Sequence, residues 1–274
     1  MATSVARGRG WCVCGERGRV VSHRSATIAR AVVLPPESRE EAVRQARTAL
    51  NVGLGRRSDA KGSSEKSVLK RISRGTKRLI VDFPLQKESP DTVAELASEL
   101  LDGVTSEKTV LCFGTRGASD SAKALNLANC YHVEESIPKK LKASSLVLVG
   151  VDESQAGLLL GSSRWSSVIA INPKGFTEGK LGGTFDTAYQ FLPLLVQGFL
   201  GFNAEGALLK CLSDSPEGSN WDIFVKDGAT FRRVASQATK PDQDELELAL
   251  YNNVAENNPL IKGFKAVKGM FSKD

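Results

Sequence analysis

A short segment rich in glycine and hydroxyl residues is the strongest candidate for chemistry. The sequence Gly-Thr-Arg-Gly-Ala-Ser at 114–119 follows an apolar run that predicts a strand and precedes a pattern that predicts a helix. At such a junction in an α/β sheet, backbone N–H groups and the helix dipole can hold a phosphate. The segment matches neither G-x-G-x-x-G nor the P-loop pattern, and it lacks the P-loop lysine. It is therefore a weak phosphate-loop candidate, for which turn and capping roles are the commoner explanation, and its candidate residues are Gly114, Thr115, Gly117 and Ser119.

Two neighbouring acids form a second candidate. Asp152 and Glu153 directly follow the apolar run 145–151, which predicts a central strand. Enzymes with α/β folds carry functional groups at the ends of such strands. An aspartate that caps the next helix explains Asp152 without any chemistry. We therefore assign no catalytic residue from the sequence.

The cysteines and histidines exclude several kinds of site. The five cysteines include no Cys-x-x-Cys pair of the kind used in zinc and redox sites. Only His23 and His132 are present, and His23 lies in a segment that we expect to be removed, so a multi-histidine metal site is excluded. Catalysis of the Ser-His-Asp or Cys-His kind would depend on His132, for which a structural role is the better explanation. The sequence predicts neither a metal nor a cofactor.

The charge is distributed unevenly along the 274 residues. The net charge is +6, yet residues 1–36 hold six arginines and one acid, and residues 51–78 hold nine basic and two acidic side chains. The part from residue 79 onward is acidic, with 19 basic and 25 acidic side chains. The basic segment contains no aromatic residue and so lacks a stacking platform for single-stranded nucleic acid. We expect a solvated loop or a contact with an acidic surface there, and no nucleic-acid partner.

The arginine-rich start predicts a targeting segment. Residues 1–34 contain serine and threonine, one acid and no continuous apolar core, as in organelle transit peptides and unlike secretory signals. The Ala-Thr-Ser start favours a chloroplast, and a disordered basic arm is the alternative. We expect residues 35–274 to form a single α/β domain with a basic mobile insertion at 53–78.

The chain then alternates between strand and helix patterns. Apolar runs predict strands at 78–84, 109–113, 145–151 and 168–172. Helix patterns lie around and between them, starting at Ser38, which forms a capping-box pattern with Glu41, at Ser89, and over 118–128 and 154–160. Repeated strand–helix alternation predicts a mainly parallel, Rossmann-like sheet with helices on both faces.

The pattern changes after residue 184. A long apolar run at 188–201 contains Pro193, and the segments 221–225 and 230–235, joined by Lys-Asp-Gly, predict an antiparallel hairpin. A helix follows at 241–255. A last helix has an apolar face with lysines alongside, which could lie on anionic lipid, although docking on the domain is the commoner outcome; its apolar residues are Ile261, Phe264, Val267 and Phe271.

Three segments together resemble a plastid and cyanobacterial family known as domain of unknown function nineteen-ninety-five. Residues 35–46 are similar to its opening pattern, PP-x-S-x-EEA-x-x-QA, and residues 77–85 resemble its first strand. Residues 244–251 and 258–263 resemble its final helix and tail. The order and spacing of these segments extend the resemblance over residues 35–272.

The resemblance implies a chloroplast protein in the stroma or at the thylakoid surface. One family member is the low-photosystem-II-accumulation assembly factor, which helps integrate a chlorophyll-binding inner-antenna subunit. Other members are fused to adenylate kinase, but this chain has no kinase P-loop, so kinase activity is not carried over. The implied function is non-enzymatic support of a thylakoid photosynthetic complex, with a protein partner at the membrane. The alternative is a stromal domain that binds or acts on a nucleotide or phosphorylated metabolite.

Overall fold

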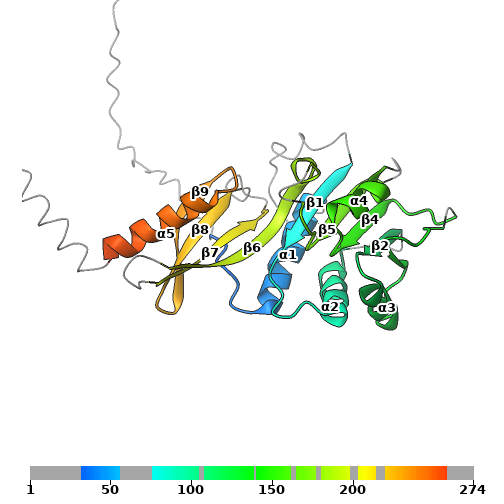
Figure 1. Cartoon of the computed structure of the whole chain (residues 1–274), viewed down its shortest axis with the longest axis horizontal. Coiled ribbons are helices and arrows are strands. Elements are labelled where there is room, and N and C mark those ends of the chain that lie inside the picture. Colours follow the sequence, from blue (N-terminus) through cyan, green and yellow to red (C-terminus); the bar gives the residue numbers. More distant parts are fainter. Residues whose placement is uncertain are drawn as a thin grey trace, which may run out of the picture. The chain divides into compact units, whose positions relative to one another are not determined.

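The computed structural model describes residues 32–55, 76–104, 108–138, 140–161, 165–176, 180–197, 203–213 and 220–257 (Figure 1). The described residues from Val33 onward belong to one compact unit. They form one sheet with the strands β1 Lys77–Asp82, β2 Thr109–Phe113, β3 Cys130–His132, β4 Ser145–Val149, β5 Ser167–Ile171, β6 Asp186–Gln197, β7 Asn203–Cys211, β8 Trp221–Asp227 and β9 Thr230–Gln237. The helices are α1 Arg39–Gly53, α2 Pro90–Leu101, α3 Arg116–Ala124, α4 Glu153–Leu160 and α5 Gln243–Asn257, and Gly182–Thr184 forms a 3₁₀ turn.

The sheet is parallel in its first part and antiparallel in its second. Its strand order is β3-β2-β4-β5-β1-β6-β7-β8-β9. The pairs from β3 to β6 are parallel, and β6 to β9 follow one another as an antiparallel meander. The predicted mainly parallel α/β sheet and the predicted C-terminal hairpin, β8 and β9, are confirmed. Gly228 adopts a φ of 61° in the hairpin turn, where glycine has no steric penalty.

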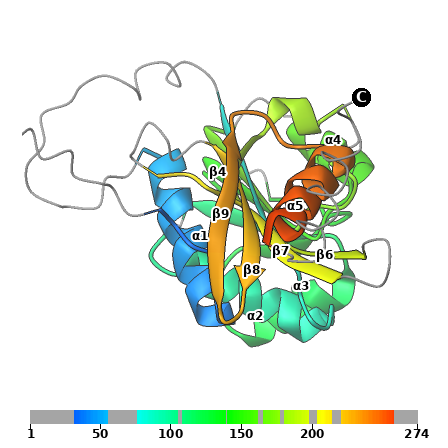
Figure 2. The same ribbon diagram turned by 90° about the vertical axis from the view of Figure 1, so that its left-hand side faces the viewer.

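Helices cover both faces of the sheet, as predicted. Alternate strand residues point to opposite faces, so Val81 packs with α1, α2 and α3 while its neighbour Ile80 packs on the side of α4. Helix α5 covers the antiparallel strands, where Leu250 packs against Leu208. Figure 2 shows α1 and α5 on opposite sides of the strands. β4 is buried on both faces from Leu146 to Val149, as expected for a central parallel strand.

The helix starts follow the predicted capping residues, with one difference. Ser89 caps α2, Pro90 occupies the first helical position, and Thr92 completes a capping box. Ser38 caps α1 by accepting a hydrogen bond from the N–H of Glu41. The predicted return bond is displaced by one residue, because the Glu41 carboxylate accepts from the N–H of Glu37 instead of from the cap residue.

The apolar run at 188–201, to which the sequence assigned no element, forms most of β6. Only the first part of this strand lies inside the sheet, because β1 ends at Asp82, opposite Gln190. From Phe191 to Gln197 the described strands provide one neighbour only, β7. Pro193 is compatible with this position because an edge strand does not need every N–H for pairing. Residues 198–202 lie outside the described residues.

Several predictions concern parts of the chain outside the described residues. The predicted transit peptide, except for its last three residues, and the predicted C-terminal helix with Ile261, Phe264, Val267 and Phe271 belong to this group. Most of the expected basic insertion at 53–78 also lies outside the described residues, which lack 56–75. At the two ends of the expected range, Gly53 ends α1 and Lys77 begins β1. Among the described helices, none is both long enough and apolar enough to cross a membrane.

Candidate functional site

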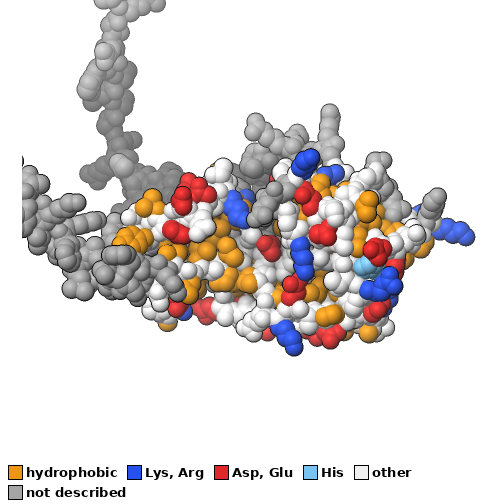
Figure 3. All heavy atoms as spheres, viewed as in Figure 1, with side chains coloured by type: hydrophobic (Ala, Val, Ile, Leu, Met, Phe, Trp, Pro, Cys, Tyr) orange, Lys and Arg blue, Asp and Glu red, His pale blue; other side chains and the backbone are white. Residues whose placement is uncertain are grey.

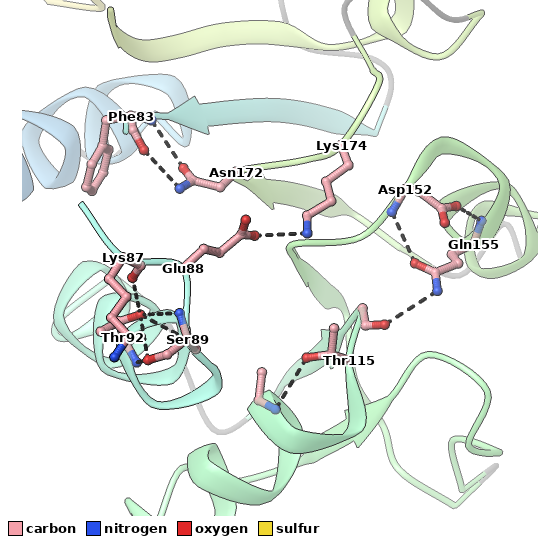
Figure 4. A network of polar contacts seen from close by, with 12 residues as sticks. Phe83, Lys87, Glu88, Ser89, Thr92, Thr115, Asp152, Gln155, Asn172 and Lys174 are labelled. Carbon is pink, nitrogen blue, oxygen red and sulfur yellow. Dashed lines mark hydrogen bonds and ion pairs between the residues drawn. The ribbon is translucent and has the colours of Figure 1, made fainter. Parts of the chain in front are cut away.

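The predicted phosphate segment lies at the carboxyl edge of the parallel strands, where the winding of the sheet reverses. The chain leaves β2 toward β3 on one side and leaves β4 toward β5 on the other, although β2 and β4 are neighbours. Ligands of open α/β sheets bind outside such a switch point. Figure 4 shows this edge with Thr115, Asp152 and Asn172 around it. The fold therefore brings the two candidate segments of the sequence, 114–119 and 152–153, together.

Gly114 is held tightly where β2 ends. Its N–H donates to the carbonyl oxygen of Val149 at 2.9 Å, and its own carbonyl oxygen lies 3.5 Å from the Nε2 of Gln155, which donates to it. A Cβ at this position would lie 2.2 Å from the carbonyl oxygen of Gly150. The close approach of two backbones thus requires glycine at position 114, whether or not a ligand binds.

The other three candidate residues have different surroundings. Thr115 caps α3, with its Oγ1 accepting from the N–H of Ala118 at 3.4 Å. Gly117 is exposed in the first turn, whereas Ser119 is fully buried, and its hydroxyl has no hydrogen-bond partner among the described residues. The first-turn N–H groups of Arg116 and Gly117 have no acceptor within the helix and face outward from its start. Three of the four residues therefore surround the start of α3, and Ser119 lies inside the protein.

The two acids after β4 take part in local structure. Asp152 caps α4 by accepting from the N–H of Gln155 at 2.8 Å, and the Gln155 side chain accepts from the N–H of Asp152 at 3.1 Å. Hydrogen bonds from the Gln155 backbone and from Ser154 lower the pKa of Asp152. The Glu153 carboxylate accepts from the N–H of Leu181 and thereby fixes the loop that precedes β6. Both carboxylates are therefore engaged by backbone N–H groups, that of Asp152 at the start of α4 and that of Glu153 at Leu181.

The neighbouring strand ends carry two further polar contacts (Figure 4). Asn172 follows β5 with a φ of 44° and bonds the backbone of Phe83 twice, accepting from its N–H at 3.1 Å and donating to its carbonyl at 2.9 Å. Lys174 forms an ion pair of 2.9 Å with Glu88, which lies just before α2. The Asn172 contacts join the ends of β1 and β5 across the sheet.

His132 has the structural setting that the sequence favoured. It is buried at the end of β3, and its Nδ1 accepts from the backbone N–H of Glu134 at 3.4 Å. The described contacts of His132 include no serine or cysteine side chain. Within the described ranges, no group of three histidine, cysteine or acidic side chains is arranged to hold a metal ion.

A polar row crosses the sheet, and the sequence did not predict it. Aligned pairs run from Asp82 on β1 through Gln190, Lys210 and Trp221 to Gln237 on β9. The buried Gln190 donates from Nε2 to the Oδ2 of Asp82 at 2.7 Å. Burial raises the pKa of Asp82, while the bond from Gln190 and the charge of Lys240 act in the opposite direction. The available signal was an acid inside the apolar sequence Leu-Ile-Val-Asp-Phe at 79–83.

A sequence profile of a known domain family matches residues 36–248, and the family is described as a domain of unknown function, DUF1995. The chain belongs to the DUF1995 family. No curated protein matches it, and no solved structure matches it. The DUF1995 match begins beside the cap of α1 and ends within α5, so it includes both the switch point and the polar row. The resemblance inferred from the sequence is confirmed at the level of this family.

Proposed function

We propose that this DUF1995 protein is a non-enzymatic auxiliary factor in the assembly or maintenance of a thylakoid photosynthetic complex of the photosystem II type. It would act in the chloroplast stroma or at the thylakoid surface, after removal of an N-terminal transit peptide. The proposal rests on the family resemblance for its setting. The observation that carries the binding role is the apolar edge formed by the outer half of β6, which has one neighbouring strand among the described residues.

The outer half of β6, residues 191–197, combines two features of a protein-binding surface. Its backbone pairs only with β7 among the described strands, and a partner strand could add to its other side, where no described strand pairs with it. Leucines lie on both of its faces, with Leu192 39% exposed and Leu195 62% exposed. In Figure 3 hydrophobic side chains gather over the strands below α5. Exposed apolar side chains on an unpaired edge favour association with another protein.

The same proposal includes a contact with the membrane surface. Ile261, Phe264, Val267 and Phe271 recur at helical spacing near three lysines, a pattern that suits the interface of anionic lipid. A protein held to the thylakoid in this way would be released by salt or carbonate. The membrane contact and the β6 edge would then act together, since the first brings the protein to the membrane and the second engages the subunit.

Affinity capture with matched variants tests the proposal. The full chain is presented to detergent-solubilised thylakoids, and photosystem II-type subunits are quantified in the captured fraction. We expect Leu195→Asp to abolish capture and Leu192→Asp to weaken it. Leu158→Asp is the control, because Leu158 is 83% exposed on α4, outside the β6 edge. Equal capture by all variants, or a wild-type protein that fractionates with the stroma without partners, would contradict the proposal.

A second candidate is recognition of a nucleotide or phosphorylated metabolite at the start of α3. It is favoured by the place of Gly114, Thr115 and Gly117 at the switch point, with outward N–H groups in the first turn of the helix. A ligand that binds only the folded state raises the melting temperature by mass action. We expect a shift with nucleotides or sugar phosphates that Arg116→Glu removes, and no shift across the panel would exclude this candidate.

A further inference from the structure

We propose that the polar row holds a small hydroxylated organic anion, with its phosphate or carboxylate group beside the ammonium groups of Lys210 and Lys240 at the indole of Trp221. The inference goes beyond the proposed protein-binding role, because it concerns another surface and a small ligand. It also differs from the candidate at the start of α3, since none of its residues belongs to that loop.

The register of the strands places the row on one face of the sheet. Asp82, Gln190, Lys210 and Trp221 are aligned partners on four adjacent strands, and aligned partners share a face. That face is the one covered by α4 and α5, because Ile80 and Leu208, two residues from Asp82 and Lys210, pack there. Between the apolar cluster under α4 and the one under α5, the sheet thus presents a line of polar groups.

Two cations share one aromatic ring in this row. The Nζ of Lys210 lies 5.0 Å from the centre of the Trp221 ring, and the Nζ of Lys240, from the segment before α5, lies 5.6 Å from it. Each contact alone is an ordinary cation–π interaction. Two positive charges drawn to one side chain repel each other, and an anion bound beside both would offset this repulsion.

Three donor groups around Trp221 have no hydrogen-bond acceptor among the described residues. Among the described residues, no acid lies within 4.0 Å of the Nζ of Lys210 or Lys240, and neither ammonium group forms a hydrogen bond. The indole N–H of Trp221 likewise has no described acceptor, although this residue is only 5% exposed. Burial lowers the pKa of Lys210, and the more distant charge of Asp186 opposes this effect. A partly buried ammonium group with no carboxylate within 4.0 Å is a favourable partner for an anion, and the charges of Asp186 at Lys210 and of Asp82 at Lys240 act from farther away.

The other end of the row indicates the rest of the ligand. Asp82 and Gln190 bind each other, but a carboxylate and an amide each retain further hydrogen-bonding positions. Such a pair suits hydroxyl groups, which both donate and accept. A sugar phosphate or a hydroxy acid carries both an anionic group and hydroxyl groups, which are the two kinds of group that the two ends of the row would bind.

Nuclear magnetic resonance of the indole groups provides a direct test, because the chain has only three tryptophans. The ¹⁵N-labelled full chain is titrated at constant ionic strength with inorganic phosphate and with glycerol 3-phosphate. We expect saturable movement of the Trp221 indole signal, assigned with Trp221→Phe. Lys210→Met and Lys240→Met keep most of the aliphatic stem and should each weaken binding at least tenfold. Asp82→Asn should weaken binding of glycerol 3-phosphate more than binding of inorganic phosphate.

Matched lysine variants separate this site from others. Lys174→Met removes the ion pair with Glu88 at the carboxyl edge of the parallel strands, and Lys226→Met removes a surface ion pair with Glu205. Neither lysine belongs to the polar row, so both variants should bind as the wild type does. An unsaturated, linear shift, or equal affinity in the Lys210 and Lys240 variants, would overturn the proposal. Loss of binding in Lys174→Met alone would place the anion at the carboxyl edge and would overturn it equally. Capture of thylakoid subunits depends on Leu195, so the two proposals fail independently.

Discussion

Gly114 lies so close to Gly150 that a Cβ on Gly114 would be 2.2 Å from the Gly150 carbonyl oxygen. These glycines follow the neighbouring parallel strands β2 and β4, and the N–H of Gly114 bonds the carbonyl of Val149 just before Gly150. Gly150 itself has a φ of 60°, which L side chains rarely adopt. The segments that follow β2 and β4 are therefore in contact where they leave the sheet. Close packing explains the glycine at position 114, and the backbone conformation explains the glycine at position 150.

We expect Gly114→Ala to lower the free energy of unfolding by about 1–3 kcal/mol, the usual effect of forcing atoms into a packed site. The matched control is Gly157→Ala in α4, where a Cβ meets nothing within 4 Å. That substitution should stabilise the protein by about 0.5–1 kcal/mol, because alanine favours helix over glycine. Urea denaturation measures both, and equal stability of Gly114→Ala and the wild type would contradict the close approach.

Asn172 should be important for joining β1 to β5. We expect Asn172→Ala to destabilise the protein by about 2–4 kcal/mol, since it loses both bonds to Phe83 and leaves alanine at a φ of 44°. Asn172→Gly loses the same bonds but accepts the backbone conformation, so its effect should be smaller. Thermal and urea denaturation of both variants separate the two contributions. A glycine variant as unstable as the alanine variant would show that the backbone conformation contributes little.

Asp82 should make stability depend on pH. Its pKa in the folded protein is raised above the ordinary value of 3.8, so the folded state holds the proton more tightly than the unfolded state. The protonated carboxyl group is therefore the form that the folded state favours. As pH rises from 3.8 through the folded pKa, Asp82 must ionise in its buried position, and the free energy of unfolding falls. We therefore expect Asp82→Asn to gain stability relative to the wild type over that interval and to keep the gain at neutral pH.

The Asp82 prediction is checked by urea denaturation from pH 3 to pH 7. Asp227→Asn, at the exposed end of β8 before the turn to β9, changes the same formal charge outside the row and is the control. Parallel pH profiles for the wild type and Asp82→Asn would show that burial of this carboxyl group has no energetic consequence.

The described thiols should be unreactive in the folded protein. Burial raises the pKa of Cys130 to about 11 and that of Cys211 to about 12, and Cys112 is fully buried on β2. Because the thiolate is the reactive form, a thiol whose pKa is raised by burial reacts slowly at pH 8. We expect iodoacetamide at pH 8 to leave all three unmodified in the native protein and to label them in urea. Rapid native labelling of Cys211, which is half-buried on β7, measured by peptide mapping, would contradict the raised pKa of this thiol.

The sequence predicted the helices and strands well where the deciding interactions are local. Ser89 with Pro90, and Asp152 before α4, act through hydrogen bonds to residues three positions away, so their roles follow from spacing. The run Leu-Val-Leu-Val at 146–149 predicted a strand buried on both faces because its composition leaves no polar side. β6 was missed as a strand because Pro193 argues against one unless the strand is known to be an edge.

The candidate site was predicted only in part, because its geometry depends on which strands are neighbours. The sequence placed 114–119 and 152–153 after strands, but only the order β2-β4 makes them meet at a switch point. Ser119 was grouped with the loop by position, yet the helix turns its hydroxyl into the interior. The row from Asp82 to Trp221 joins residues up to 139 positions apart, and no local pattern indicates such an alignment.

The sequence by itself determined the α/β class, the capping residues, the C-terminal hairpin and membership of the family, since these depend on composition, periodicity and short-range spacing. Only the tertiary structure decided that β1 lies between β5 and β6, that the outer half of β6 has one described neighbour, and that Lys210 and Lys240 meet at Trp221. The physical reason is that strand pairing joins distant segments through backbone hydrogen bonds common to all residues. Side-chain patterns indicate that a strand forms, whereas packing of the whole chain selects its neighbours.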